Sequence, residues 1–101
     1  MVSSDRNFGF ETFDYTRHML EKADERDIDL DQVEQTIEYG EKIAEYPDDK
    51  PYKSYLYLAF FQSKPLHVCF ALVNATECKV ITAYEPSLTI FEDDFKTRRK
   101  K

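Results

Sequence analysis

The sequence is poor in cysteine and has no long hydrophobic run. Its longest apolar stretch, from Leu56 to Phe61, is far shorter than the ~20 residues that a membrane helix needs. The N-terminal segment has neither a basic start nor an apolar stretch of ~7 or more residues, so we expect no secretory signal. These absences predict a cytoplasmic protein that does not enter a membrane.

The two cysteines do not predict a disulfide bond. Cys69 and Cys78 fall on segments that we interpret as neighbouring strands, about four residues out of register, which separates them by about 13 Å along the strands. A disulfide bond cannot span that distance. The acidic clusters at 48–49 and 92–94 have no histidine or cysteine at ligand spacing, so we interpret them as solvated turns. No metal and no cofactor is expected.

Positive charge is scarce in most of the chain. Residues 1–95 carry all 20 acidic residues and nine of the 14 lysines and arginines, which gives a formal charge of -11. The other five basic residues lie in residues 96–101. An acidic body repels phosphate groups, so the composition disfavours broad nucleic-acid binding. We interpret the basic tail as a frayed, solubilising end, with a contact to RNA as the alternative.

A chain of 101 residues can bury one modest core, so we expect a single domain. Its first part mixes turn-forming residues with Phe8, Phe10 and Phe13, whose rings are expected to pack on the core. The expected organisation, in chain order, is an irregular lead over 1–13, two helices over 14–40, an antiparallel sheet over 42–85, and a C-terminal segment with a basic tail over 86–101.

Two helices are predicted from the 3.6-residue spacing of apolar side chains. Asp14 is expected to cap the first helix, which continues to about Asp27. The second helix has a sharper start, because residues 29–32 have the spacing of a capping box. Gly40 is expected to end it in the left-handed conformation, which glycine adopts without a steric cost.

Beyond Gly40 the apolar spacing changes to two residues, which predicts strands. The expected strands are 42–46, 54–62, 65–73 and 78–85. Residues 62–65 and 74–77 have the composition of hairpin turns. The sequence therefore predicts an α+β fold, with two N-terminal helices on one face of a four-stranded antiparallel sheet and a short C-terminal helix or turn.

The hairpin turns also predict which residues share a face of the sheet. The predicted opposite pairs on one face are His67 and Tyr84, Cys69 and Thr82, and Ala71 and Val80. The other face is more apolar and is expected to carry the helices. Its predicted residues are Leu66, Val68, Phe70, Leu72 and Ile81. Because Leu56 and Leu58 share the His67 face, we expect a cover there, from Phe91 and Phe95 of the C-terminal segment or from another subunit.

Several segments resemble a known bacterial family in order and spacing. They are EYPDDKPYKSYLYL, KPLHV, ITAYEP and FEDDFKTRRK, preceded by His18, Lys22, Glu25, Arg26 and Ile28. From about residue 15 to its end, the chain resembles the family catalogued as domain of unknown function 4258. The departures are mild: Lys53 stands where proline is common, Phe91 where tryptophan is common, and Cys69 where an aliphatic residue is usual. The resemblance implies a fold like that of the RelE/ParE and BrnT toxins of toxin-antitoxin pairs.

The resemblance also directs attention to RNA cleavage, which many RelE-type toxins perform by activating the ribose 2′-hydroxyl. Without a metal, this reaction needs a base, an acid and cations. The candidate catalytic residues are His67, Tyr84, His18 and Arg26. The candidate substrate-binding residues are Lys22, Lys53, Arg98 and Arg99. His67 and Tyr84 could exchange a proton across their strands, and His18, Lys22 and Arg26 could form one positive row on the first helix.

Each candidate also has a structural interpretation. His67 could hydrogen-bond Tyr84 within the sheet. His18 and Arg26 could hold the first helix by pairing with Glu45 or with residues 48–49. The favoured function is a partner-binding module related to type II toxins, with an antitoxin-like protein as its partner, because the body is acidic. The alternatives are an active metal-independent endoribonuclease, which alone would bind RNA, and a structural homodimer.

Overall fold

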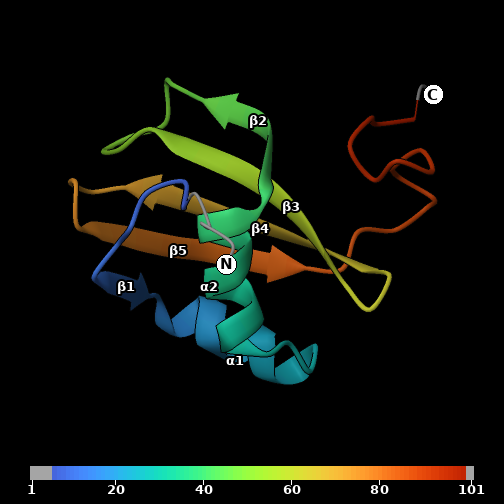
Figure 1. Ribbon diagram of the computed structural model, residues 1–101, viewed down its shortest axis with the longest axis horizontal. Helices are drawn as coiled ribbons and strands as arrows, with labels where there is room; N and C mark the ends of the chain where they lie inside the picture. The colour runs from blue at the N-terminus through green and yellow to red at the C-terminus, as the bar shows by residue number, and fades with distance from the viewer. Residues whose placement is uncertain (1–5, 100–101) are drawn as a thin grey trace, which may run out of the picture.

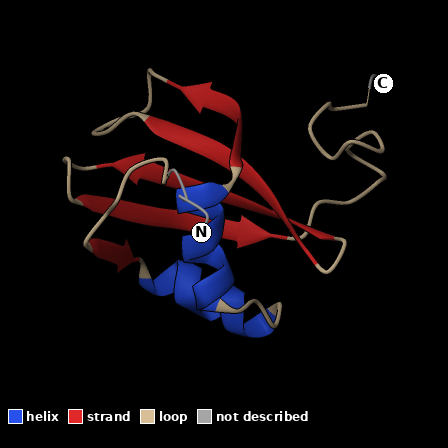
Figure 2. Cartoon of the chain, in the orientation of Figure 1, coloured by secondary structure: helices blue, strands red, loops and turns tan. Residues whose placement is uncertain are grey.

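A computed structural model describes residues 6–99 and places two helices against one mixed sheet. The elements, in chain order, are β1 (Thr12–Tyr15), α1 (Arg17–Glu25), α2 (Leu30–Tyr39), β2 (Glu41–Tyr46), β3 (Ser54–Phe61), β4 (Lys64–Leu72) and β5 (Glu77–Tyr84). Among the described residues the sheet has five strands, in the order β1-β5-β4-β3-β2. Both helices lie together on one side of it (Figures 1 and 2). Neither helix of this region is long and apolar enough to cross a membrane.

The prediction of four antiparallel strands was wrong by one strand. Residues 12–15 form β1, which runs parallel to β5 and places Phe13 opposite Cys78 and Tyr15 opposite Val80. The other neighbouring strands are antiparallel, as predicted. Four residues are too few to show a clear alternation, and the partner strand lies near the other end of the chain. Sequence periodicity therefore could not detect β1.

Helix α1 begins later than predicted because Thr16, not Asp14, is its N-cap. The Thr16 hydroxyl accepts the amide proton of Met19 at 3.0 Å, whereas Asp14 lies within β1. The predicted start of α2 is confirmed, since the Asp29 carboxylate accepts the amide proton of Asp31 at 2.8 Å.

The main core lies between the helices and the sheet, on the face predicted to be the more apolar. Its fully buried side chains include Met19, Val33, Ile37, Val68, Phe70 and Val80. The aromatic rings of the lead join this core, as predicted. Phe10 is buried, and its ring stacks on Phe8 with a centroid distance of 4.8 Å. The burial of these rings places the lead firmly against the sheet.

The predicted register of β4 and β5 is confirmed near His67 and wrong beyond Cys69. His67 lies opposite Tyr84, but Phe70 rather than Ala71 lies opposite Val80. An extra residue in β5, Ile81, causes this shift. A β-bulge of this kind exchanges the faces to which the residues between the bulge and the turn point. Val80 therefore enters the helix-side core, and Ile81 is 37% exposed. Turn residues alone carry no signal for such a bulge.

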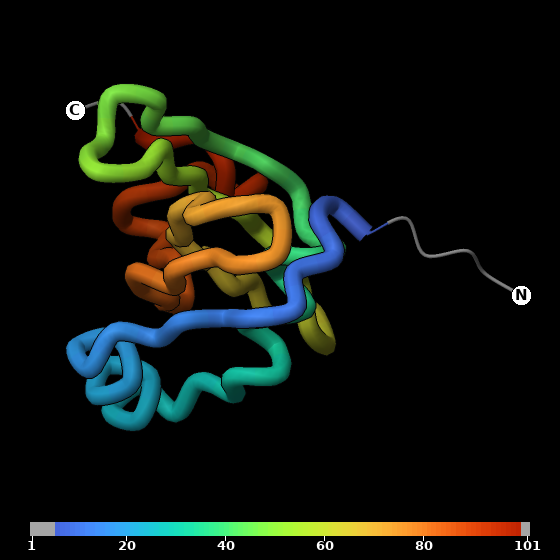
Figure 3. Tube along the Cα trace, turned by 90° about the vertical axis from the view of Figure 1, so that its left-hand side faces the viewer, coloured from blue at the N-terminus to red at the C-terminus, as the bar shows by residue number. Residues whose placement is uncertain are grey.

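The C-terminal segment, residues 86–99, covers the second face of the sheet. In Figure 3 this segment lies on the side of the strands away from α1. Phe91 is buried, and the ring of Phe95 contacts the ring of Phe60 with centroids 6.1 Å apart. Leu56 and Leu58 are buried in the single chain, so the chain provides its own cover. Of the two predicted forms, helix or turn, the segment takes the second in its described part, since it forms turns and no helix.

Candidate functional site

His67 and Tyr84 form the predicted cross-strand pair on the covered face. The Nδ1 atom of His67 lies 3.2 Å from the Tyr84 hydroxyl oxygen, and Nε2 lies 2.6 Å from the backbone carbonyl oxygen of Phe95. A carbonyl oxygen can only accept, so Nε2 carries a proton and donates it to Phe95. In the neutral ring Nδ1 then accepts the hydroxyl proton of Tyr84. Both ring nitrogens are therefore occupied within the chain.

The environment of the pair holds both side chains neutral near pH 7. His67 is 0% exposed, and the ring of Phe91 packs against it with centroids 4.7 Å apart. Burial lowers the pKa of His67; the hydrogen bond to Phe95 opposes this shift, and the charge of Arg98 adds to it. Burial also raises the pKa of Tyr84. The pair is thus a closed, uncharged contact between the sheet and the C-terminal segment.

The burial of His67 predicts a loss of stability in mild acid. The unfolded chain binds a proton on this histidine near the ordinary pKa of 6.5, whereas the folded chain binds it only at lower pH. Stability from this group is therefore complete above pH 6.5 and is lost as the pH falls from there toward the folded pKa. Urea denaturation at about pH 7.5 and about pH 5.5 should show a larger loss for the wild type than for His67→Gln. Equal losses in the two proteins would contradict the prediction, because the two proteins differ only at position 67.

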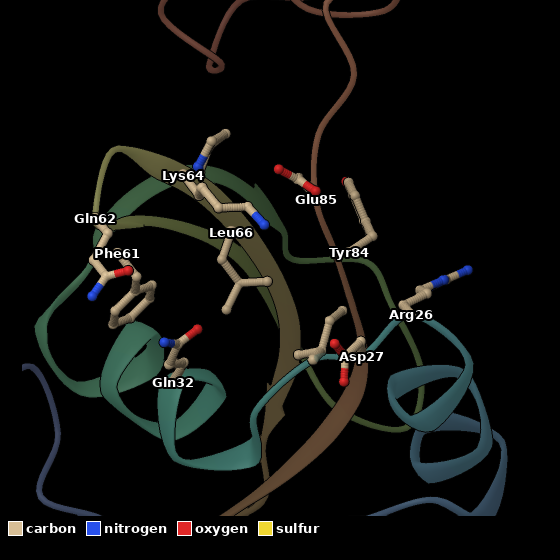
Figure 4. A pocket seen from close by; sticks show the side chains of 11 residues that line it. Arg26, Asp27, Gln32, Phe61, Gln62, Lys64, Leu66, Tyr84 and Glu85 are labelled. Atoms are coloured by element: carbon tan, nitrogen blue, oxygen red, sulfur yellow. The ribbon is translucent and has the colours of Figure 1, made fainter.

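A groove of about 610 Å³ lies beside this pair, at the end of β5. Its apolar lining consists of Ile28, Phe61, Pro65 and Leu66. Its polar lining consists of Arg26, Asp27, Gln32, Gln62, Lys64, Tyr84 and Glu85. Figure 4 shows that the lining residues come from the α1–α2 connection, from α2, from the β3–β4 hairpin and from the end of β5, and that the side chains of Arg26 and Tyr84 point away from the centre of the groove. Its volume lies within the range of small-ligand sites, and its lining is more polar than that of most such sites.

The groove brings together two of the predicted catalytic residues, Arg26 and Tyr84. Arg26 follows the last turn of α1, and its Nη1 donates to the carbonyl oxygen of Ala83 at 2.8 Å, which holds the side chain next to the end of β5. The lining is balanced in charge, because Asp27 and Glu85 oppose Arg26 and Lys64. A balanced lining over an apolar floor suits a small polar ligand or a peptide better than a polyanion.

Comparison with known proteins supports one family. The sequence model of the family described as Domain of unknown function (DUF4258) matches residues 15–85. The chain belongs to the DUF4258 family. The DUF4258 match covers both helices, β2 to β5, His67 and Tyr84, and it ends before the C-terminal segment. No curated protein and no solved structure gave a significant match.

The remaining candidates on the DUF4258 region do not converge on the groove. His18 is exposed on α1, and Lys22 pairs with Glu25 of the same helix at 3.4 Å. Lys53 pairs with Glu45 at 2.9 Å. The predicted contact of Arg26 with Glu45 or residues 48–49 was wrong, because Lys42 and Lys53 hold Glu45 while Arg26 bonds to β5.

The basic tail beyond the DUF4258 match is folded in its described part and is not frayed. Arg98 lies over the ring of Phe91 at 5.5 Å, and Arg99 pairs with Glu92 at 3.2 Å. Asp94 closes a turn by accepting the amide protons of Lys96 and Thr97, and these bonds lower the pKa of Asp94 to about 2. Positions 100 and 101 lie outside the described residues. Across residues 6–99 no three histidine, cysteine or acidic side chains converge as metal ligands would.

Sequence reasoning missed Lys64 and Glu85 as neighbours of Arg26 and Tyr84. Both lie in segments that carry the DUF4258 resemblance, KPLHV and ITAYEP. Their presence in those segments was the available signal. The groove itself could not be predicted, because four separate parts of the chain form it.

Proposed function

We propose that this DUF4258 protein is a partner-binding module with a fold related to type II toxin-antitoxin toxins, and that its partner is an antitoxin-like protein. The closed state of His67 carries this proposal. Its two ring nitrogens bond to Tyr84 and Phe95, and its side chain has no exposed surface. A general base needs an available nitrogen within hydrogen-bond reach of the hydroxyl that it activates. His67 offers none in this arrangement.

The distribution of charge supports the same function. The formal charge of -11 over residues 1–95 opposes the binding of RNA, which depends on cations that displace counterions. Two candidate substrate-binding side chains, Lys22 and Lys53, are paired with carboxylates. A structural homodimer is less favoured, because the apolar His67 face is covered by the C-terminal segment of the same chain.

A metal-independent endoribonuclease is the second candidate, favoured by the groove beside Tyr84. Arg26 and Lys64 supply two positive charges there, and the edge of Tyr84 lines the same space. In that case the groove, and not the His67 ring, would receive the RNA. Lys64 is the appropriate residue to test, because it is exposed whereas Arg26 also holds α1 against β5.

We expect purified protein to leave single-stranded RNA intact and to form a stable complex with a small protein encoded beside it. The RNA assay compares the wild type with His67→Ala, Lys64→Ala and the control Lys79→Ala, which removes an exposed strand lysine outside the groove. The complex is measured by co-expression and size-exclusion chromatography.

RNA cleavage by the wild type that is lost in His67→Ala or Lys64→Ala, but kept in Lys79→Ala, would establish the endoribonuclease and overturn the proposal. Thermal unfolding of each variant shows whether a lost activity reflects a lost fold. If no complex forms with the protein encoded beside it, the proposal of an antitoxin-like partner is wrong.

A further inference from the structure

Strand β3 has an edge that its neighbour does not fill. β2 pairs with β3 only from Ser54 to Leu58, whereas β4 pairs with β3 as far as Phe61. β2 begins directly after Gly40, which ends α2, so β2 does not extend beside residues 59–61 of β3. Residues 59–61 therefore have a strand on one side only among the described residues.

The backbone of Phe60 faces this open edge. Phe60 lies opposite Pro65 in β4. Proline has no N–H group, so these two residues cannot exchange the two hydrogen bonds of a bonded pair. In an antiparallel ladder, a residue of a non-bonded pair directs its N–H and C=O groups to the other side of its strand. One donor and one acceptor of Phe60 are thus available to an added strand.

A hollow of about 420 Å³ lies at the same edge, between the end of α2 and β3. Two aromatic side chains border it, and both are unusually exposed: Tyr39 at 51% and Phe60 at 53%. Exposed aromatic residues that gather at one hollow are typical of a protein interface. Gln35, Tyr39 and residues 58–61 define what we term the Phe60 surface.

The Phe60 surface continues into an acidic hollow on α2. This second hollow shares Gln35 and Tyr39 and is also lined by Asp31, Glu34, Glu38 and Arg6. Glu38 is buried and bonded to Arg6 and to the amides of the lead, and Glu34 accepts the Tyr15 hydroxyl proton, so the exposed Asp31 is the carboxylate through which the hollow attracts a cation. The surrounding body is also strongly acidic. The charge therefore complements a basic partner and repels an acidic one.

We propose that the Phe60 surface binds a lysine- or arginine-bearing extended segment of a partner protein. The segment pairs its backbone with Phe60, places an apolar side chain between Tyr39 and Phe60, and directs basic side chains toward Asp31. This inference rests on the proposed partner-binding function and names the class of partner and the place where it binds.

The probe is a capped hexapeptide of alternating lysine and leucine, added to the full chain labelled with ¹⁵N. We expect saturable shifts of the amide signals of Phe60 and Tyr39. A peptide of alternating glutamate and leucine should bind at least about tenfold more weakly, and so should the double variant Phe60→Ser/Tyr39→Ser toward the lysine peptide. The control variant Tyr52→Ser removes a similarly exposed aromatic residue outside the hollow and should bind as the wild type does.

Equal affinity of the double variant and the control, or shifts spread evenly over the acidic body, would overturn the inference in favour of attraction by charge alone. Shifts at Phe60 that grow with protein concentration without peptide would assign the edge to a second copy of this chain and would also overturn it. RNA cleavage together with specific peptide shifts would overturn the proposed function and confirm the Phe60 surface, so the two failures are distinguishable.

Discussion

Replacement of Glu38 by alanine is expected to lower the free energy of unfolding by about 3–5 kcal/mol. This carboxylate is only 3% exposed, and it accepts the amide protons of Phe8, Gly9 and Phe10 at 3.0, 2.8 and 2.6 Å. Alanine would leave three backbone donors without this acceptor, one of them buried and two partly buried. Since a domain is ordinarily stable by about 5–15 kcal/mol, the loss is a large share. Urea denaturation followed by circular dichroism measures it.

Two further variants separate the causes. Glu41→Ala is the matched control, because Glu41 is exposed and its side chain, within residues 6–99, makes a surface ion pair with Lys96 alone, so a small change is expected. Glu38→Gln keeps an acceptor oxygen but directs an NH₂ group at the amides of the lead, so it should fall between the other two. If Glu38→Ala unfolds no more readily than Glu41→Ala, this carboxylate does not anchor the lead.

The sequence predicted the aromatic contacts of the lead but not its hydrogen bonds to Glu38. Phe8, Phe10 and Phe13 in an otherwise polar segment indicated contact with the core, and they make it. Glu38 gave no such signal, because in the helical pattern it is one acidic residue among several. Its burial arises when Gly9, at a φ of 82°, bends the lead so that consecutive amides converge on one carboxylate. This bend brings together segments that are far apart in the sequence, so no local sequence pattern indicates it.

At the candidate site, too, one contact of His67 was predicted from the sequence and the other was not. The predicted pairing of His67 with Tyr84 is correct, but the turn between β4 and β5 does not fix it alone. Next to the turn the register differs by one residue from the prediction, and the bulge at Ile81 restores the predicted pairing at His67. The partner of the other ring nitrogen is the carbonyl of Phe95, in an irregular segment with no periodic pattern. This unpredicted contact decides the tautomer and closes the ring to a substrate.

Replacement of Gly40 by alanine is expected to destabilise the protein by about 2–3 kcal/mol. The sequence indicated the right residue for the wrong reason, because Gly40 is extended, at φ -81° and ψ -176°, and not left-handed. An added Cβ would lie 2.4 Å from the carbonyl oxygen of Thr36 and 2.7 Å from that of Leu58. Both atoms are backbone, one in α2 and one in β3, so relief requires the helix to move from the strand. The midpoint of urea denaturation measures the loss.

Gly9→Ala provides the contrasting control for this close approach. Gly9 has a left-handed backbone, but no atom lies within 4 Å of the position of its Cβ, so its replacement carries a conformational cost of about 1–2 kcal/mol without a clash. We expect Gly40→Ala to be the more damaging variant, and to shift the amide signals of Leu58 and Phe60 because β3 is displaced. If Gly40→Ala is as stable as Gly9→Ala and the β3 signals are unchanged, α2 and β3 are not held at this short distance. The position of α2 beside the open edge at Phe60 would then not be fixed by the contact at Gly40.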